Sequence, residues 1–256
     1  MPSLLRRFGL IAAASAILAG TPVFAETPFT PAQRDAIQAI IKDYLVKNPE
    51  VLQEAIAELE KRQAETQRVA QQAALNESRT VLTSSPYGAV VGNPAGDVTL
   101  VEFFDYNCGY CKRALTDLRG LMKADGKLKV VLRDLPVLGP DSVEASRVAL
   151  AAKQQLSGDK LFEYHARLLE SRGKVGGERA LALAKEMGLD MGRLQKDMTG
   201  PEVKAAVAES EGLAQKLGLT GTPAYVIGDE VISGAIGLEP LKQAVVMTRK
   251  CGRATC

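Results

Sequence analysis

Aromatic and imidazole side chains are scarce in this chain. Its 256 residues include no Trp and one His, and aromatic residues make up 5%. A surface that stacks nucleic-acid bases needs aromatic rings, so this composition argues against nucleic acid as a partner. An excess of one sign of charge is missing too, because 32 Lys and Arg stand against 30 Asp and Glu. Arg6 and Arg7 account for the difference, so the rest of the chain has equal numbers of basic and acidic residues. Such a balance of charge is not typical of a polyanion-binding protein.

Long hydrophobic runs are missing outside the first 25 residues. There, Arg6 and Arg7 precede an apolar stretch at residues 8–19, and residues 23–25 offer a cleavage site. The stretch is well short of the ~20 residues that span a bilayer. We therefore predict a cleaved export signal over residues 1–25, with an uncleaved membrane anchor as the alternative. The Arg pair is a poor fit to the twin-arginine route. Export would place the protein in an oxidising compartment.

Cysteine is also rare, and one pair of the four cysteines lies where a strand pattern changes into a helix pattern. Residues 98–104 form a short β-branched and aromatic run, which is typical of a buried strand. After Cys111 the apolar residues Leu115, Leu118 and Leu121 recur at helical spacing. Cys108 and Cys111 therefore straddle a strand-to-helix turn. The free N–H groups and the dipole at a helix start stabilise an anion there.

A thiolate is such an anion, so the position of Cys108 favours a reactive thiolate. Lys112 and Arg113 add positive charge nearby. We expect dithiol–disulfide exchange, in which Cys108 attacks or is attacked and Cys111 resolves the mixed disulfide.

Two other interpretations of the pair stay open: half of a zinc site and an inert structural disulfide. Zinc would need further ligands from Cys251, Cys256 or His165, and an inert bridge would close too small a loop to stabilise much. We interpret His165 as an ordinary helix-face residue, since thiol exchange needs no histidine. Cys251 and Cys256 could stay free, accept metal or form a small tail disulfide, which export favours.

The region before the cysteine motif predicts a helical arm over residues 26–82. Thr30, Pro31 and Gln33 form a helix start with a capping box, followed by an apolar face. Asn48 and Pro49 interrupt the pattern, and we expect Asn48 to cap a second helix with Pro49 at its first position. The apolar stripe of the second helix is narrow, so we expect the arm to pair with other copies of the chain. The alternative is a helix folded back on its own domain.

The remaining elements predict an α/β domain over residues 83–256. Strands are expected at residues 89–91, 98–104 and 127–135, followed by a helical block at about 141–218. A strand opening at Pro223, a Gly228-Asp229 turn and a second strand form a hairpin, and a helix at 236–247 closes the domain. Pro223 follows Gly221 and Thr222 in a tight entry where a cis peptide bond is plausible.

This order of elements resembles the thioredoxin fold with a helical insertion, as in the DsbA family of periplasmic thiol–disulfide oxidoreductases. The resemblance covers about residues 85–250 and is carried by residues 103–111, by Glu102 and by Gly221-Thr222-Pro223. The arm together with this domain resembles the suppressor-of-copper-sensitivity protein C (ScsC) subgroup.

The resemblance implies a role for each matching residue. Cys108 would be the exposed nucleophile and Cys111 the buried resolving thiol, and Glu102 the buried acid that handles the proton of Cys111. Burial would raise the pKa of Glu102; the alternative is a surface acid at a strand edge. Pro223 would be a cis-proline that faces the cysteines, and the backbone at Thr222 would pair with an extended substrate.

The residues between the cysteines depart from the strong oxidases of the family, which carry Pro-His there. Gly109-Tyr110, with Thr before the proline, resembles the periplasmic disulfide isomerases, so we expect lower oxidising power. The expected partners are cysteine-containing exported proteins, a membrane thiol–disulfide reductant or oxidant, and further copies of the chain. No cofactor is implied, because the cysteines carry the electrons. A net dithiol oxidase and a Cu(I)-binding protein that uses Cys108 and Cys111 are the alternatives.

Overall fold

The computed structural model describes residues 29–256, so the predicted export signal at residues 1–25 lies outside the described residues. Within the described part, the chain forms the following helices and strands: α1 (Pro31–Lys47), α2 (Glu50–Ser84), β1 (Ala89–Gly92), β2 (Val98–Phe104), α3 (Gly109–Ala124), β3 (Leu128–Asp134), α4 (Pro140–Ala152), α5 (Gly158–Leu169), α6 (Gly177–Glu186), α7 (Met191–Asp197), α8 (Pro201–Lys216), β4 (Ala224–Ile227), β5 (Glu230–Ser233) and α9 (Leu238–Cys251). None of these helices is long and apolar enough to cross a membrane.

The strands form one sheet in the order β1-β3-β2-β4-β5. β2 runs parallel to β3 and antiparallel to β4, and the two edge strands are antiparallel to their neighbours. The predicted hairpin is confirmed, with Gly228 at φ +59°, a conformation that favours glycine in a tight turn. This is the mixed α/β architecture that the sequence predicts, and β2 lies at its centre.

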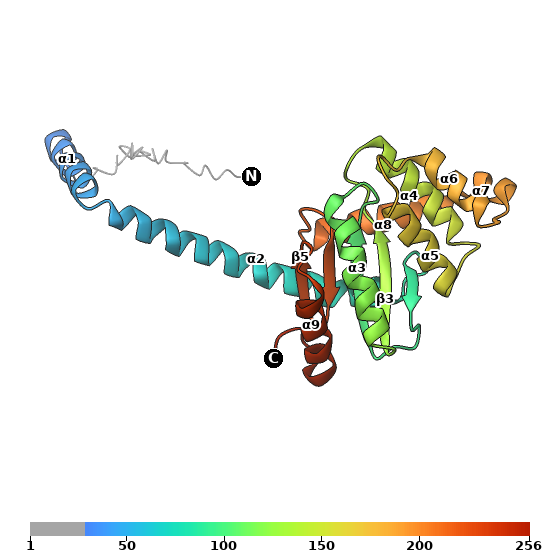
Figure 1. The fold of residues 1–256 in the computed structure, drawn as a ribbon. Helices are drawn as coiled ribbons and strands as arrows, with labels where there is room; N and C mark the ends of the chain where they lie inside the picture. The colour runs from blue at the N-terminus through green and yellow to red at the C-terminus, as the bar shows by residue number, and fades with distance from the viewer. Residues whose placement is uncertain (1–28) are drawn as a thin grey trace, which may run out of the picture. The chain divides into compact units, whose positions relative to one another are not determined.

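Both faces of the sheet are covered, which explains why β2 is an almost uninterrupted apolar run. On one face, Leu100 and Phe104 pack with residues of α3, α5 and α9. On the other face, Val101 and Phe103 pack with residues of α2 and α8. Figure 1 shows α3 in front of β3, with α8 behind it. The C-terminal end of β2 is thereby held rigidly from both sides, at the point where the cysteine motif begins.

The predicted helical block is present as α4 to α8, between β3 and β4. Small residues of α4 and α6, among them Ala145, Val148 and Ala180, are buried in the same core as β2. The Tyr164 hydroxyl of α5 donates to Ala180 O at 2.8 Å. The block therefore packs as part of the domain and extends the core beyond β1.

The described chain divides into a first compact unit that ends at Glu60 and a second formed by Lys61–Cys256. In the first unit, the predicted capping box of α1 is confirmed, with Thr30 and Gln33 bonding to each other's backbone. The expected role of Asn48 is wrong: its side chain donates to Tyr44 O at 2.8 Å and so ends α1, and α2 begins at Glu50, after Pro49. The reason is that both the backbone N–H and the side-chain amide of Asn48 donate to the Tyr44 carbonyl, which makes Asn48 the C-cap of α1.

In the second unit, the C-terminal part of α2 packs on the sheet, with Leu75 and Leu82 in the core. Arg133 of β3 is 1% exposed and fixes this helix end. Its guanidinium forms an ion pair with Glu209 of α8 and donates to the Val81 carbonyl. The carbonyls that a helix end leaves free are thus bound by a buried cation.

Candidate active site

The turn after β2 places Cys108 at the start of α3. Cys108 is the N-cap residue, with extended backbone angles (φ −75°, ψ 117°), and its carbonyl accepts from Lys112 N at 3.1 Å. Cys108 therefore takes the position at which a first helical turn leaves N–H groups free, although its side chain makes no cap hydrogen bond. Cys111 follows within that turn and is fully buried. Both thiols are free, as dithiol chemistry requires.

The loop before β4 meets these cysteines. The Thr222–Pro223 peptide bond is cis, as the sequence predicts. Cys108 Sγ donates to the Thr222 carbonyl at 3.1 Å. Residues separated by more than a hundred positions are therefore joined at the sulfur, and this contact is the defining feature of the site.

The expectation that Cys108 is exposed is wrong. Its relative exposure is 6%, against 0% for Cys111, because the Thr222 loop lies against the sulfur. The spacer between the cysteines forms the surface instead. Tyr110 is 59% exposed, a side chain at Gly109 would meet open space, and the Arg113 guanidinium lies 4.3 Å from the centre of the Tyr110 ring. A substrate therefore meets Tyr110 and Arg113 before it reaches the sulfur.

Glu102 is buried inside the sheet, which excludes the alternative of a surface acid. It lies in β2, opposite Tyr225 of β4, and is 1% exposed. Burial raises the pKa of Glu102 to about 8. Burial also raises the pKa of the Cys111 thiol, and the charge of Glu102 raises it further. Among the described residues, Glu102 Oε2 has no hydrogen-bond partner. An acid without a fixed partner, electrostatically coupled to a buried thiol, is suited to exchange a proton with it.

A buried hydrogen-bond network around Asp105 fixes the turn. Its carboxylate accepts from Asn107 N at 2.8 Å, from the Ser142 hydroxyl at 2.7 Å and from Leu138 N at 3.0 Å. Our sequence reasoning missed this role. An Asp at the start of a turn favours an Asx turn, in which its carboxylate accepts from the backbone N–H two residues on, and this predicts the first of these bonds. The contacts to residues 138 and 142 depend on how the helical block packs, which the sequence alone does not indicate.

His165 is buried among aromatic rings and not on a solvent-facing side of α5. Its ring centre lies 4.5 Å from that of Phe104 and 5.6 Å from that of Tyr106. Burial lowers the pKa of His165 to about 3, so the ring is neutral at physiological pH. It therefore acts as a packing residue in the core.

The four cysteines differ in whether they are available to a metal. Cys251 and Cys256 form a disulfide, so the predicted tail disulfide is confirmed and these sulfurs are not available for zinc. Over residues 29–256, no group of three His, Cys, Asp or Glu side chains is placed to hold a metal. Cys108 and Cys111 remain as a pair of soft donors of the kind that Cu(I) accepts.

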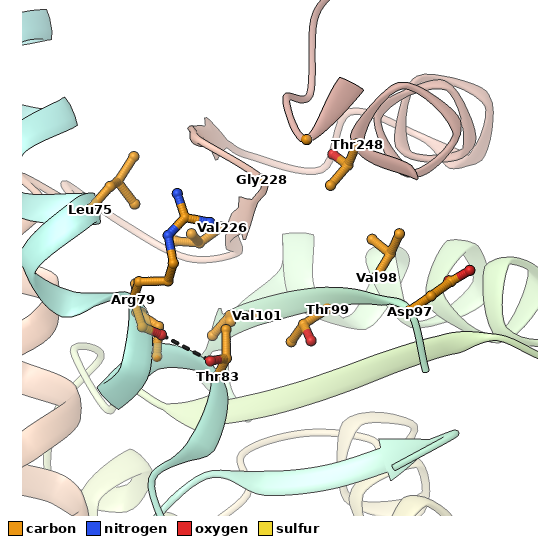
Figure 2. Close-up of a pocket in the computed structure, with 12 residues that line it drawn as sticks. Leu75, Arg79, Thr83, Asp97, Val98, Thr99, Val101, Val226, Gly228 and Thr248 are labelled. Atoms are coloured by element: carbon orange, nitrogen blue, oxygen red, sulfur yellow. Dashed lines mark hydrogen bonds between the residues drawn. The ribbon is translucent and has the colours of Figure 1, made fainter. Parts of the chain in front are cut away.

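A cavity of about 320 Å³ lies at the other end of β2, and it does not belong to the thiol site (Figure 2). The start of β2 at Val98 and Thr99 lines it, together with Arg79 of α2 and Gly228 of the hairpin turn. Its lining includes neither cysteine of the site and not Thr222 or Pro223, so this cavity is separate from the chemistry of Cys108.

Comparison with known families agrees with this geometry. Residues 99–246 match the DSBA-like thioredoxin domain, and residues 33–65 match the copper resistance protein ScsC N-terminal domain. The chain belongs to the DSBA-like thioredoxin domain family. The resemblance to this family and to its ScsC subgroup is confirmed.

The chain is also similar to solved structures and to curated relatives. A thioredoxin-like oxidoreductase from Silicibacter pomeroyi DSS-3 is 46% identical, with 68% of this chain and 98% of that chain covered and a TM-score of 0.64. A linker-deletion mutant of Proteus mirabilis ScsC is 26% identical, with 88% and 99% covered and a TM-score of 0.63. The Na(+)/H(+) antiporter NhaA 1 of Salinispora arenicola is 28% identical over 158 residues, which are 61% of this chain. That match spans only 24% of the antiporter.

Proposed function

We propose that this protein is an exported thiol–disulfide oxidoreductase that acts on protein disulfides. The observation that carries the proposal is the position of Cys108 Sγ, at the start of α3 and 3.1 Å from the Thr222 carbonyl. The Cys108 thiolate attacks a substrate disulfide, and one substrate sulfur leaves as a thiolate. Cys111 then attacks the Cys108 sulfur, which releases the second substrate thiolate and leaves a Cys108–Cys111 disulfide. The substrate gains the two electrons that the protein loses.

Glu102 is the proposed proton acceptor for the second step. The Cys111 thiol must lose its proton before it attacks, and its burial opposes ionisation. A carboxylate with a pKa of about 8 is ionised in part near neutral pH and can take that proton.

Gly109 and Tyr110 favour the isomerase or reductase direction over net oxidation. They offer no imidazole to stabilise the Cys108 thiolate, so the reduced protein is less favoured than in a strong oxidase. Isomerisation would require the pair to be kept reduced, for which we propose a membrane thiol–disulfide reductant in the periplasm. The opposite direction, with a membrane oxidant, is the alternative that a redox titration separates.

The arm of residues 26–82 is proposed to join copies of this chain. In the first unit, α1 has no buried residue, and the exposed side chains of Ile40, Val46 and Ile56 are each more than half accessible. Apolar side chains at this density on a helix need a partner. Matching arms of other copies supply one with the same chemistry, and this arrangement would bring several thiol sites together.

The activity test compares the full chain with its Cys108→Ala variant. We expect insulin reduction and the refolding of scrambled ribonuclease to be lost in Cys108→Ala. We expect both activities to persist in the control variant Cys251→Ala/Cys256→Ala, whose disulfide lies outside the site. If both activities survived in Cys108→Ala, the proposed exchange would be wrong.

The second candidate function is Cu(I) binding by Cys108 and Cys111. It is favoured by the match of residues 33–65 to a copper resistance protein domain. A Cu(I) titration of the reduced protein against the alkylated protein tests it, because alkylation removes both soft donors.

A further inference from the structure

A loop of the helical insertion lies directly against the active-site turn. The Asn107 side chain donates to Val175 O at 2.9 Å and accepts from Val175 N at 2.8 Å. The Lys112 ammonium donates to the Ser171 carbonyl at 3.0 Å. Residues 171–175 therefore form one wall of the surface around the cysteines. Hydrogen bonds at both ends of this segment hold it to the active-site turn.

This wall carries positive charge that the protein does not neutralise. A depression of about 550 Å³ is lined by Arg167, Glu170, Ser171, Arg172 and Arg179. Among the described residues, the exposed Arg172 has no hydrogen-bond or carboxylate partner, and the exposed Arg179 donates to the Ser171 hydroxyl at 3.1 Å. Lys112 bonds to carbonyls alone. We call Lys112, Arg172 and Arg179 the basic surface.

Two acidic neighbours of the basic surface are bound to other cations. Glu170 forms an ion pair with Arg119, and Glu186 forms one with Arg167. Two further acids of this region, Glu178 and Glu144, have no cation partner among the described residues, and Glu144 accepts from Gly177 N at 3.4 Å. Arg172 and Arg179 have no carboxylate partner within the described chain either, so their charges remain available to an acidic group of another molecule.

We propose that the basic surface selects acidic segments of protein substrates. The inference rests on the proposed exchange function and names the substrate class of that site. Lys112 lies about one helical turn, ~5.4 Å, beyond Cys108, and an extended chain advances about 3.3 Å per residue. A substrate whose cysteine reaches Cys108 therefore places an Asp or Glu about two to six residues away on Arg172 and Arg179. Such complementary charge raises the rate of productive encounter more than the final affinity.

The test measures the rate at which the reduced full-length protein reduces three disulfide peptides. The peptides differ only in the residues two to six positions from the cysteine, which are Glu, Gln or Lys. We expect the Glu peptide to react about tenfold faster than the Lys peptide at low salt, a difference that shrinks as ionic strength rises. We expect Arg172→Glu/Arg179→Glu to abolish or reverse this preference, measured as the ratio of the Glu-peptide rate to the Lys-peptide rate in the same protein.

Two matched variants separate the effect from total charge. Lys123→Glu/Lys127→Glu makes the same change of charge at the other end of α3, and Arg172→Lys/Arg179→Lys keeps the charge in place. Both should retain the preference for the Glu peptide. Equal rates for the Glu and Lys peptides in the unmodified protein would overturn the inference. Binding of anionic lipid vesicles that requires Arg172 and Arg179, without any peptide preference, would overturn it too. Loss of all three rates would instead contradict the proposed exchange function.

Discussion

Glu102 and Cys111 are two acids buried under the sulfur of Cys108, where ionisation of either is harder. Burial raises the pKa of both groups, and the charge of Glu102 raises the pKa of Cys111 further. A protein keeps such a pair only at a cost in stability, because one of the two must stay protonated in a water-free environment. That cost is understandable if the proton is passed between them during exchange.

The raised pKa of the buried Glu102 carboxyl predicts how the free energy of unfolding depends on pH. Its pKa is about 8 in the folded protein against an ordinary value of 4.5, so between these values the folded state holds a proton that the unfolded state has lost. Stability therefore falls as pH rises through this window. In Glu102→Gln this loss should disappear, so that the unfolding free energy falls between pH 5 and pH 8 by on the order of 2–3 kcal/mol less than in the unmodified protein.

Urea unfolding at a series of pH values measures this slope. The slope is the informative quantity, since a buried Gln shifts the stability by a constant amount at every pH. Asp134 is also buried, and its pKa is raised to about 7, so part of the slope should remain in the variant. Parallel plots of unfolding free energy against pH for the two proteins would show that Glu102 keeps its ordinary pKa in the folded protein.

A substitution at Tyr110 should change the preferred direction of thiol–disulfide exchange. Tyr110→His introduces an imidazole beside Cys108, and the imidazolium form stabilises the thiolate and hence the reduced protein. We expect the variant to be the stronger oxidant, with an equilibrium constant against glutathione shifted about tenfold or more toward the reduced form. Tyr110→Phe is the control, because it keeps the ring under Arg113. An unchanged equilibrium constant in Tyr110→His would show that the spacer does not set the redox balance.

At the level of elements, the sequence indicated the sheet and the reactive turn well because their signals are local. The run at residues 98–104 is buried on both faces, so it reads as a strand without alternation, and β2 spans those residues. The capping box at Thr30, the Gly228 turn and the cis bond at Pro223 also depend on neighbouring residues alone. By contrast, the burial of Cys108 and the bonds of Asp105 depend on segments that approach from residues 138–142 and 222. The spacing of apolar residues along the sequence does not indicate such contacts between distant segments.

The C-terminal end of α2 depends on one buried cation. Arg133 is 1% exposed and binds both Glu209 and the Val81 carbonyl. Arg133→Met should destabilise the second unit by about 2–4 kcal/mol, because a carboxylate and helix-end carbonyls lose their partner. The control Arg193→Met breaks an ion pair between Arg193 and Asp197 on α7 and should cost less than about 1 kcal/mol. Denaturant unfolding compares the two, and equal small effects would contradict the anchoring role.

At the scale of the whole molecule, the division into two units would separate the thiol chemistry from the proposed assembly of copies. The second unit contains both cysteines of the site, the loop at Thr222 and the covered sheet. Over residues 29–60, the first unit offers exposed apolar side chains and no buried residue. A substitution in α1 should therefore change assembly and leave the thiol chemistry of each copy intact.

Ile40→Glu/Ile41→Glu tests this separation, since the two side chains are 66% and 51% exposed. We expect the full-length protein to have a solution mass of several chains and the variant to have the mass of one. Insulin reduction per thiol site should stay within about twofold, while refolding of scrambled ribonuclease should fall. A single-chain mass for the unmodified protein would contradict the role of the arm and would favour the net oxidase.

The most direct measurement is the capture of a mixed disulfide by Cys111→Ala. Without its resolving thiol, the protein should stay covalently bound to a disulfide substrate, and peptide mass spectrometry should locate the bond at Cys108. The account predicts this adduct in Cys111→Ala and its loss in Cys108→Ala/Cys111→Ala. An adduct at Cys251 or Cys256, or no adduct with any protein disulfide, would contradict the assignment of Cys108 as the attacking sulfur.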